Sequence, residues 1–480
     1  MTMTEKSAVV DDLAKALRDV LGPDGLLTDA RAMEPYGREL RGMFDALPAM
    51  VARPVSTDAV SQVVALCAAA GVGIVPQGGR TGLVGGGTAQ PGAGQIVLSL
   101  ERMNRILSIE PLDDTMTVEA GCVLADLQRA AQQADRLFPL SLGAEGSCQI
   151  GGNLSTNAGG INVLRFGNAR DLVLGLEVVL ADGRVWNGLR QLRKDNTGYD
   201  LKHLFIGAEG TLGIITRAVL KLFPRPRDVA TAFIGVASPD AAITLLPRLR
   251  AASGERITSF ELIERFPLEV ALAHTPNTRD PLGEPHASYV LVELSSAQPG
   301  AGLSQVLEHS LDAAMDDGLV EDAVFASSDK EAEGFWRIRE GIVWAQAHYG
   351  ASIKHDVSIP VSRVPAFLQQ ADDAAERVVP GIRPCAFGHI GDGNIHYNLT
   401  GPAGMDDAEF LAHRPAINLA VHDVVAGLDG SISAEHGLGQ LRRDDIQRYK
   451  SPLELELMWR LKDSLDPRAI MNPGKLLPPR

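Results

Sequence analysis

The sequence predicts an α+β protein with more than one domain. Its 480 residues exceed what one core usually holds, because single hydrophobic cores stop growing at about 250–300 residues. Two glycine-dense stretches interrupt strand patterns in the first half of the chain, and strand and helix patterns alternate in the second half. We expect domains over 1–226 and 227–430, and a C-terminal segment over 431–480 that returns to the first domain and completes the active site.

The composition excludes several classes of protein. Asp and Glu number 60 against 45 Lys and Arg, without a long basic run, which argues against binding to nucleic acid or to an anionic membrane surface. No apolar run approaches the roughly 20 residues of a membrane span, and the N-terminus lacks an apolar stretch of signal-peptide length. We therefore expect a cytoplasmic protein without a membrane span. The 4 dispersed cysteines argue against a disulfide scaffold or a thiolate metal site.

The first domain begins with helix and strand patterns in turn. We expect a helix over 8–21, a strand over 50–54, and a helix that Ser56 caps and Gly71 ends. The following elements are expected as strands over 95–100, 105–109 and 115–120, a helix over 124–134, and strands over 174–180 and 183–186.

The two glycine-dense stretches favour a nucleotide ligand. In residues 77–87 the glycines leave backbone amides uncovered beside Arg80, an arrangement suited to a pyrophosphate. Their spacing differs from the nicotinamide-dinucleotide fingerprint, and a flexible surface turn is the alternative. Residues 141–160 combine hydroxyls, amides and glycines with little charge, which suits a polar ring such as an isoalloxazine.

Four ordered motifs in this half resemble the FAD domain of the p-cresol methylhydroxylase and vanillyl-alcohol oxidase superfamily. They are Pro-x-Gly-Gly-x-Thr-Gly from Pro76, Val118-Glu119-Ala120-Gly121, the Gly-Gly-Asn-x-Ser-Thr-Asn-Ala-Gly-Gly run from Gly151, and Gly-x-Glu-Gly-Thr-Leu-Gly-Ile ending at Ile214. The resemblance implies a two-part FAD-binding domain. The FAD contacts that it implies are Pro76, Gly78, Gly79, Arg80, Thr81, Gly82, Ser141, Gly146, Ser147, Gly151, Gly152, Asn153, Ser155, Thr156, Asn157, Glu209 and Ile214. Many relatives attach FAD through a histidine in the first loop, but the first histidine here is His203, so we expect non-covalent FAD.

The second domain alternates strand and helix patterns. Strands are expected over 230–236, 257–262, 289–294, 323–327 and 352–359, and helices over 239–252, 301–317, 329–348, 363–378 and 406–427. This alternation predicts an α+β layer with a partly antiparallel sheet, followed by a helical C-terminal segment.

A metal site is predicted around Gly388–His396. Asp392-Gly393 is typical of a two-residue hairpin turn, which would place His389 opposite His396 with Cβ atoms roughly 5 Å apart. Glu435 would complete a His/His/Glu set with an open fourth position, the pattern of a catalytic zinc. Hydrogen-bonded histidines at a hairpin are the alternative.

A flavin and a divalent metal together favour oxidation of a 2-hydroxy acid. Its hydroxyl and carboxylate oxygens can chelate a Lewis acid, which lowers the hydroxyl pKa for hydride transfer to flavin. His436 is a candidate base for the hydroxyl proton, or otherwise a structural histidine. Arg339 and Lys354 are candidate carboxylate anchors, or otherwise surface charges.

The C-terminal half resembles the D-2-hydroxyglutarate and D-lactate dehydrogenase branch of the superfamily. The resemblance rests on Phe387 to Asn398, Ser433-Ala434-Glu435-His436-Gly437 and Asn472-Pro473-Gly474-Lys475. It implies zinc on His389, His396 and Glu435, the base His436, substrate anchors Arg339, Lys354 and Asn398, and Asn472 close to the flavin. Glutarate-type members usually have Thr where this chain has Val343, so a substrate carboxylate loses one hydrogen bond there.

We expect a dehydrogenase of D-2-hydroxyglutarate, with D-lactate and D-malate close behind. A non-catalytic flavoprotein subunit of a glycolate-oxidising complex and an oxygen-using oxidase are the alternatives. The electron acceptor is expected to be an electron-transfer flavoprotein, a quinone or a cytochrome. Manganese and cobalt are alternatives to zinc as the metal. The chain is compatible with a homodimer.

Overall fold

A computed structural model describes residues 3–480, with side chains from residue 10. The chain divides into two compact units. Unit 1 contains the chain up to Gly159, residues 168–225 and residues 436–480, and unit 2 contains residues 160–167 and 226–435. Residues 160–167, expected in the first domain, and residues 431–435, expected in the C-terminal segment, therefore group with unit 2.

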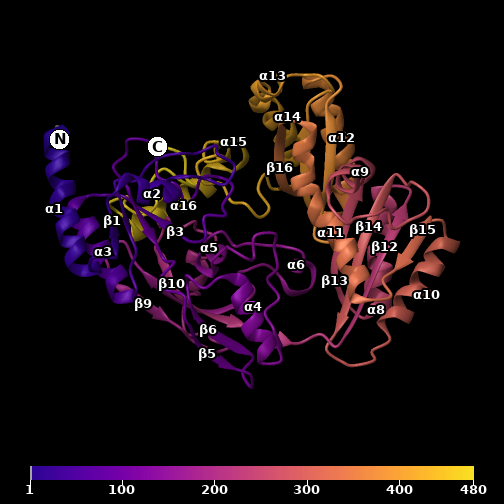
Figure 1. Cartoon of the computed structure of the whole chain (residues 1–480), viewed down its shortest axis with the longest axis horizontal. Coiled ribbons are helices and arrows are strands. Elements are labelled where there is room, and N and C mark those ends of the chain that lie inside the picture. The colour runs from indigo at the N-terminus through magenta and orange to yellow at the C-terminus, as the bar shows by residue number, and fades with distance from the viewer. Residues whose placement is uncertain (1–2) are drawn as a thin grey trace. The chain divides into compact units, whose positions relative to one another are not determined.

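Unit 1 contains a parallel-rich sheet and an antiparallel sheet (Figure 1). Its elements are α1 (Met3–Leu21), β1 (Leu26–Leu27), α2 (Ala30–Gly37), β2 (Met50–Ala52), α3 (Thr57–Ala70), β3 (Ile74–Gln77), β4 (Ile96–Ser99), β5 (Ile106–Glu110), β6 (Thr115–Glu119), α4 (Leu124–Gln133), β7 (Arg136–Leu137), α5 (Ile150–Ser155), β8 (Val173–Val179), β9 (Val185–Gly188), α7 (Lys202–Phe205), β10 (Ile214–Lys221), β11 (Phe223–Pro224), α15 (Ile446–Tyr449) and α16 (Pro452–Leu465).

The sheet order β1-β2-β4-β3 places the glycine-rich loop at the end of an edge strand, because the loop follows β3 directly. The second sheet has the order β5-β6-β10-β8-β9 and is antiparallel throughout. Helices α1 and α3 contribute to the core of the first sheet. The expected α3 is confirmed: Ser56 Oγ accepts from Ala59 N, and Gly71 ends the helix with φ 65°, a conformation that favours glycine.

The C-terminal segment adds to the β3 edge of this sheet. Ile74 N donates to Ile470 O (2.7 Å), and Asn472 N donates to Ile74 O (2.8 Å). In Figure 1 the yellow C-terminal chain accordingly lies beside indigo elements of unit 1. This pairing brings Asn472 next to the start of the glycine-rich loop.

Unit 2 is built on one seven-stranded sheet with the order β15-β12-β14-β13-β17-β18-β16. Its elements are α6 (Val163–Phe166), β12 (Asp228–Val236), α8 (Pro239–Ser253), β13 (Ile257–Glu264), α9 (Arg265–His274), β14 (Ser288–Ser296), α10 (Leu303–Asp316), β15 (Asp322–Phe325), α11 (Asp329–Ala345), η1 (Gln346–Tyr349), β16 (Ser352–Ser358), η2 (Val361–Arg363), α12 (Val364–Val378), β17 (Arg383–Gly388), β18 (Asn394–Thr400), α13 (Asp407–Ala412) and α14 (Arg414–Gly427).

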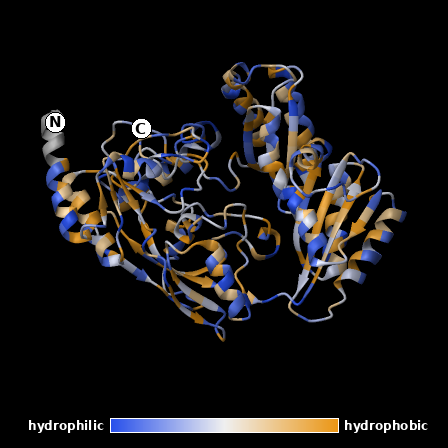
Figure 2. Cartoon of the chain, in the orientation of Figure 1, coloured by the Kyte–Doolittle hydropathy of each residue, from blue (hydrophilic) through white to orange (hydrophobic). Residues whose placement is uncertain are grey.

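Every strand pairing of this sheet is antiparallel. Figure 2 shows its central strands largely in the hydrophobic colour and the covering helices with polar outer faces. One core cluster joins the sheet to α9 and α11 through residues that include Ile263, Tyr289, Ile338 and Phe387. Side chains alternate along a strand, so every second residue of β13 and β17, including Ile263, Cys385 and Phe387, points to the face that packs against α9 and α11.

The predicted hairpin register is wrong. β17 ends at Gly388 and β18 begins at Asn394, and His396 lies opposite Phe387 rather than His389. A two-residue turn is prevented because the connection is held by its neighbours: Gly391 N donates to Phe260 O (3.1 Å), and a Cβ on Gly393 would lie 1.9 Å from Ile359 O. The Asp-Gly pair therefore belongs to a longer loop.

Two other expectations differ from the structure. The helix expected over 406–427 is two helices, α13 and α14, with the break just before Pro415, which has no backbone N–H to continue the first helix. Helix α5 interrupts the second glycine-dense stretch, where no helix was expected.

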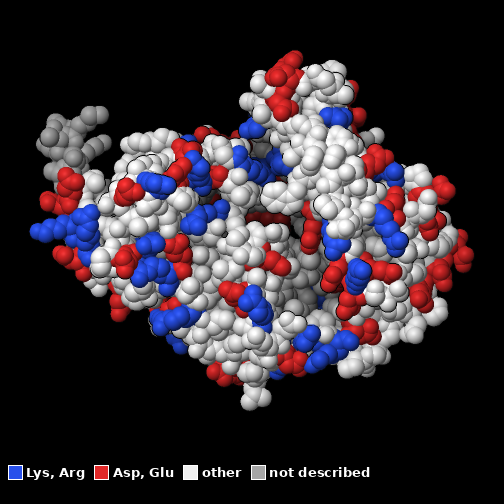
Figure 3. Space-filling model, in the orientation of Figure 1, with Lys and Arg blue, Asp and Glu red and all other residues white. Residues whose placement is uncertain are grey.

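None of the described helices is both long and apolar enough to cross a membrane. Acidic and basic side chains are interspersed on the face shown in Figure 3.

Candidate metal and flavin sites

Unit 2 brings together the three predicted metal ligands. His389, His396 and Glu435 each offer one donor atom, and these atoms lie within 4.8 Å of one another. The two imidazole rings have centroids 5.4 Å apart, and His389 Nε2 lies 4.0 Å from Glu435 Oε1. Two imidazole nitrogens and one carboxylate oxygen are a donor set that suits Zn²⁺ with an open coordination position.

Different elements position these ligands. His396 lies on β18, whereas His389 follows β17 directly after Gly388, whose φ is 141°. Glu435 lies in the segment that follows α14. This segment pairs with β16 through the Ser358–Ser431 bridge. Asp356 of β16 then fixes the end of this chain, because its Oδ2 accepts from Glu435 N (2.9 Å).

His389 is buried, His396 and Glu435 are partly buried, and nearby charges and burial shift the pKa of His389 and of Glu435. Burial lowers the pKa of His389, but the adjacent Glu261 carboxylate outweighs burial and raises it to about 9. Burial raises the pKa of Glu435 to about 7. Binding of a cation requires His389 to lose its proton and Glu435 to be ionised, so metal affinity depends on pH. The donor set fits a zinc ion.

Glu261 connects the candidate metal ligand His389 to Arg339. Its Oε1 lies 2.6 Å from His389 Nδ1, and its Oε2 accepts from Arg339 Nε at 2.7 Å. Burial disfavours the Glu261 carboxylate, yet His389 and Arg339 lower its pKa to about 2. Arg339 is 5% exposed, and its guanidinium lies over the Phe387 ring at 4.8 Å. Arg339 is therefore a buried, oriented cation rather than a surface charge.

Lys354 and Asn398 converge on Gln346. Lys354 Nζ donates to Gln346 Oε1 at 3.3 Å, and Asn398 Nδ2 donates to the same oxygen at 3.0 Å. Gln346 is fully buried, and its amide donates to Thr400 Oγ1 (3.0 Å). Val343, one turn after Arg339 on α11, is 42% exposed.

Unit 1 gathers the predicted FAD-binding loops. A Cβ added to Gly78 would meet Gln149 at 3.4 Å, and one added to Gly79 would clash with Ser147 O at 2.0 Å. The first loop thus packs against the second glycine-dense stretch, and these glycines permit the close approach. Gly82, Gly146 and Gly152 instead have open space where a Cβ would be, so their backbone is accessible to a ligand.

Glu209 and Asn472 connect three further segments of unit 1. The Glu209 carboxylate accepts from Leu438 N and Gly439 N, both at 2.8 Å. Asn472 Nδ2 donates to Gly86 O (3.0 Å) and Glu209 O (2.7 Å). Burial raises the pKa of Glu209, and the two backbone hydrogen bonds oppose that shift.

Buried polar atoms without a protein partner also fit an absent cofactor. The oxygens Gln77 Oε1, Gln149 Oε1 and Asn472 Oδ1 are buried and accept no hydrogen bond within the described chain. Buried polar atoms normally have a partner, and the flavin and ribityl groups of FAD carry N–H and O–H donors. The residues present therefore fit FAD.

The remaining predicted FAD residues have roles within the protein. Ser141, Ser147, Ser155 and Thr156 donate their hydroxyls to nearby oxygens. Asn157 Oδ1 accepts from Arg170 N. Ile214 is a core residue, and Pro76 lies beside Gly210. Arg80 contacts Glu101 (3.5 Å) and the Tyr36 ring (4.9 Å). Thr81 lies in the first glycine-rich loop, and Asn153 lies on α5. His436, the expected base, is the partly buried first residue of the last segment of unit 1.

Two sequence families match this chain. Residues 225–476 match "FAD linked oxidases, C-terminal domain", and residues 48–188 match "FAD binding domain". The chain belongs to the FAD-linked oxidase family. It is therefore an FAD-dependent oxidoreductase, and its α+β architecture with an FAD-binding domain is that of the family.

Curated members of the FAD-linked oxidase family resemble the chain over most of its length. The D-2-hydroxyglutarate dehydrogenase of Xanthomonas citri pv. viticola is 38% identical over 454 residues, covering 94% of each chain. The mitochondrial D-2-hydroxyglutarate dehydrogenase of Bos taurus is 39% identical over 473 residues, covering 98% of this chain and 84% of the relative. Among solved structures, p-cresol methylhydroxylase with substrate bound has a TM-score of 0.76 at 18% identity, covering 98% of this chain and 97% of its own. That likeness shows the fold.

Sequence reasoning missed three residues of this FAD-linked oxidase. Glu261 stands within the apolar strand β13, Asp356 follows His355 within β16, and Gln346 follows α11. A charged residue in a buried strand is rarely tolerated without a partner, so the position of Glu261 and Asp356 within strand patterns could have predicted that each has a buried partner. Nothing in the sequence distinguishes Gln346, because an amide at the end of a helix is common on protein surfaces.

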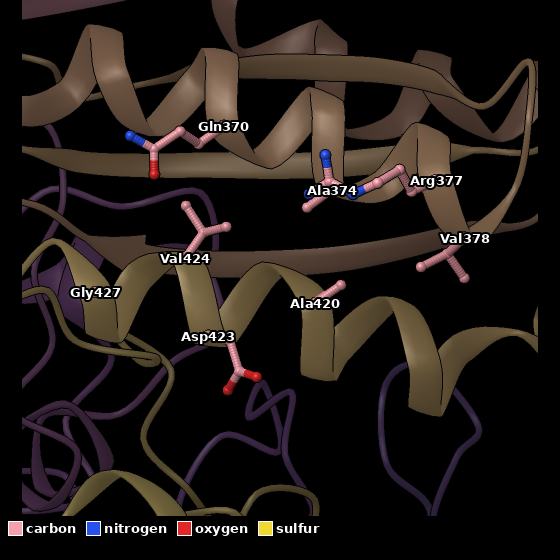
Figure 4. Close-up of a pocket in the computed structure, with 8 residues that line it drawn as sticks. All are labelled: Gln370, Ala374, Arg377, Val378, Ala420, Asp423, Val424 and Gly427. Carbon is pink, nitrogen blue, oxygen red and sulfur yellow. The ribbon is translucent and has the colours of Figure 1, made fainter.

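A shallow surface groove lies elsewhere in unit 2, between α12 and α14. Figure 4 shows Gln370 and Ala374 of α12 facing α14, which contributes Ala420 and Val424. The groove contains none of the candidate metal or substrate residues.

Proposed function

We propose that this protein is an FAD- and zinc-dependent dehydrogenase that oxidises D-2-hydroxyglutarate to 2-oxoglutarate. The observation that supports the proposal most directly is the convergence of His389, His396 and Glu435 beside the buried cation Arg339. The names of the curated relatives support the choice of substrate.

Each candidate residue has a distinct task in this proposal. His389, His396 and Glu435 would hold the zinc, with Mn²⁺ or Co²⁺ as substitutes. When bound, the ion supplies Lewis acidity that lowers the pKa of the substrate hydroxyl, and FAD supplies the hydride acceptor. An imidazole nitrogen of His436 takes the hydroxyl proton. Arg339, Lys354 and Asn398 bind carboxylate oxygens of the substrate.

D-lactate is the second candidate substrate. Val343 supplies no hydroxyl, so one hydrogen bond to the second carboxylate of a dicarboxylate is absent at this position. A monocarboxylate loses nothing there. D-malate has the same chemistry as D-2-hydroxyglutarate with a shorter chain.

The test is anaerobic reduction of the bound flavin. Purified protein is mixed with D-2-hydroxyglutarate, D-lactate, D-malate or L-2-hydroxyglutarate, with and without a zinc chelator, and flavin absorbance is followed. We expect bleaching with the D-acids, fastest with D-2-hydroxyglutarate, and slow bleaching after chelation. No bleaching with any acid would favour a non-catalytic flavoprotein subunit. If the flavin is reduced equally fast with and without the chelator, the protein is a dehydrogenase that uses no catalytic metal.

The acceptor is tested separately. We propose that the reduced flavin passes electrons to an electron-transfer flavoprotein, a quinone or a cytochrome rather than to oxygen. Dye reduction without peroxide release is the expected result, and stoichiometric peroxide in air would identify an oxidase instead.

A further inference from the structure

Glu261 is a buried carboxylate whose two oxygens have different partners. It lies in the middle of β13 with none of its surface exposed. One oxygen pairs with His389 Nδ1 at 2.6 Å, and the other accepts from Arg339 Nε at 2.7 Å. One partner is a candidate metal ligand and the other is a candidate substrate anchor.

We propose that Glu261 is a positioning residue that sets both the metal affinity of His389 and the orientation of Arg339. This inference rests on the proposed zinc site and adds a residue that acts through its ligands. It predicts that one carboxylate, which contacts neither the ion nor the substrate, affects both metal binding by His389 and substrate binding by Arg339.

Glu261 fixes the tautomer of the His389 imidazole. A neutral histidine carries one N–H, and the other nitrogen holds the lone pair that binds a metal. Glu261 accepts the N–H at Nδ1, so the lone pair lies on Nε2, the nitrogen that faces Glu435 at 4.0 Å. Carboxylates that accept from the outer nitrogen of a metal-binding histidine fix the ring and raise its basicity.

Glu261 also holds the Arg339 guanidinium in place. A buried guanidinium requires a compensating charge, and Glu261 supplies it through Nε. The face of the guanidinium lies over Phe387, at 4.8 Å from the ring centroid. The terminal nitrogens have no protein acceptor among the described residues, so they remain available to a carboxylate ligand. Glu261 and Phe387 together determine the direction in which these nitrogens point.

The decisive variant is Glu261→Gln, which keeps the size of the side chain. An amide has one accepting oxygen and a donating NH₂ group, so it cannot accept from His389 and Arg339 with different atoms. The probe is Zn²⁺ alone, titrated in competition with a chromophoric chelator against flavin-loaded protein without substrate. We expect zinc affinity to fall about 10–100-fold. Glu261→Asp keeps the charge but is one methylene shorter, and its affinity should lie between those of Glu261→Gln and the wild type.

Glu293→Gln is the matched control. Glu293 is a partly buried carboxylate on the neighbouring strand β14 that accepts from Trp336 Nε1 of α11 at 3.0 Å and from Thr231 Oγ1 at 3.3 Å. This variant should bind zinc as the wild type does, whatever its effect on thermal unfolding. If flavin-loaded Glu261→Gln binds zinc as tightly as the wild type, Glu261 does not position the ligand.

The remaining outcomes also decide the question. Should Glu261→Gln fail to fold, unaltered zinc affinity in Glu261→Asp would overturn the inference. The inference is supported if the wild type binds one zinc ion per chain and only the Glu261 variants bind zinc more weakly. Absence of zinc binding by the wild type itself would overturn the proposed metal site first, and the positioning role with it.

Discussion

Lys354 and Asn398 lie opposite one another on the neighbouring strands β16 and β18. Their side-chain nitrogens both donate to Gln346 Oε1, at 3.3 Å and 3.0 Å. Because a single carbonyl oxygen aligns two candidate substrate donors, Gln346 determines where these donors point before a ligand arrives.

Replacement of Gln346 by Leu should therefore weaken substrate binding. Without this acceptor the two donors are less well oriented, and the loss of one oriented hydrogen bond to the substrate, about 1.5 kcal/mol, corresponds to roughly tenfold in KM for the hydroxy acid. Zinc content should not change. Steady-state kinetics and metal analysis check both points. Gln370→Leu, an exposed position on α12, is the control, and an unaltered KM in Gln346→Leu would contradict the alignment.

His396→Ala should remove the metal while FAD stays bound. His396 is one of three candidate metal ligands in unit 2, whereas the predicted FAD-binding loops belong to unit 1. Zinc should fall from about one per chain to near zero, and substrate-dependent flavin reduction should stop. Metal analysis and flavin absorbance measure the two effects. His309→Ala, on the exposed face of α10, should change neither, and loss of flavin with the metal would refute the separation.

Val343→Thr should favour a dicarboxylate substrate. The new hydroxyl can donate one hydrogen bond, worth about 0.5–1.5 kcal/mol, so the kcat/KM ratio of D-2-hydroxyglutarate over D-lactate should rise about 3–10-fold. Val343→Ala removes bulk without adding a donor and serves as control. Equal ratios in the wild type and the Thr variant would show that this position does not select the substrate.

Glu209→Gln should weaken FAD retention. The Glu209 carboxylate uses separate oxygens for Leu438 N and Gly439 N, and an amide can accept with only one. One buried N–H then lacks a partner, at about 1–3 kcal/mol. The flavin-to-protein ratio after gel filtration and the Tm should both fall. Glu110→Gln, on the exposed edge strand β5, should leave both unchanged.

Glu264 should make stability depend on pH. Burial raises the pKa of Glu264 to about 7, with a smaller contribution from Asp372. A carboxyl whose folded pKa exceeds its unfolded value of about 4.3 binds more protons when folded, so stability falls as pH rises from about 4.5 to 7. Glu264→Gln should therefore stabilise the protein more at pH 8 than at pH 5, by up to about 3 kcal/mol. Denaturant unfolding at both pH values tests this, with exposed Glu308→Gln as control.

The sequence by itself determined the glycine-rich loops and most strand and helix positions, and it singled out His389, His396 and Glu435, whose donor atoms lie within 4.8 Å of one another in the structure. These features are local: glycines uncover backbone amides wherever they cluster, and the period of apolar residues along a segment specifies its conformation and its buried face. Ser56 and Gly71 bounded α3 correctly for the same reason. His389, His396 and Glu435 were selected on the donor chemistry of a zinc site and on the resemblance to the dehydrogenase branch, and their role as metal ligands stays a prediction.

Only the tertiary structure decided which distant residues meet. The period of a strand shows which face a side chain takes, but neither its neighbour nor its register, so the hairpin that opposed His389 to His396 was predicted wrongly. The contacts of Gly391 and Gly393 with segments far along the chain lengthened that loop. Glu261 is separated from its partner His389 by more than a hundred residues of chain, and only the packing of β13 beside β17 brings the two together.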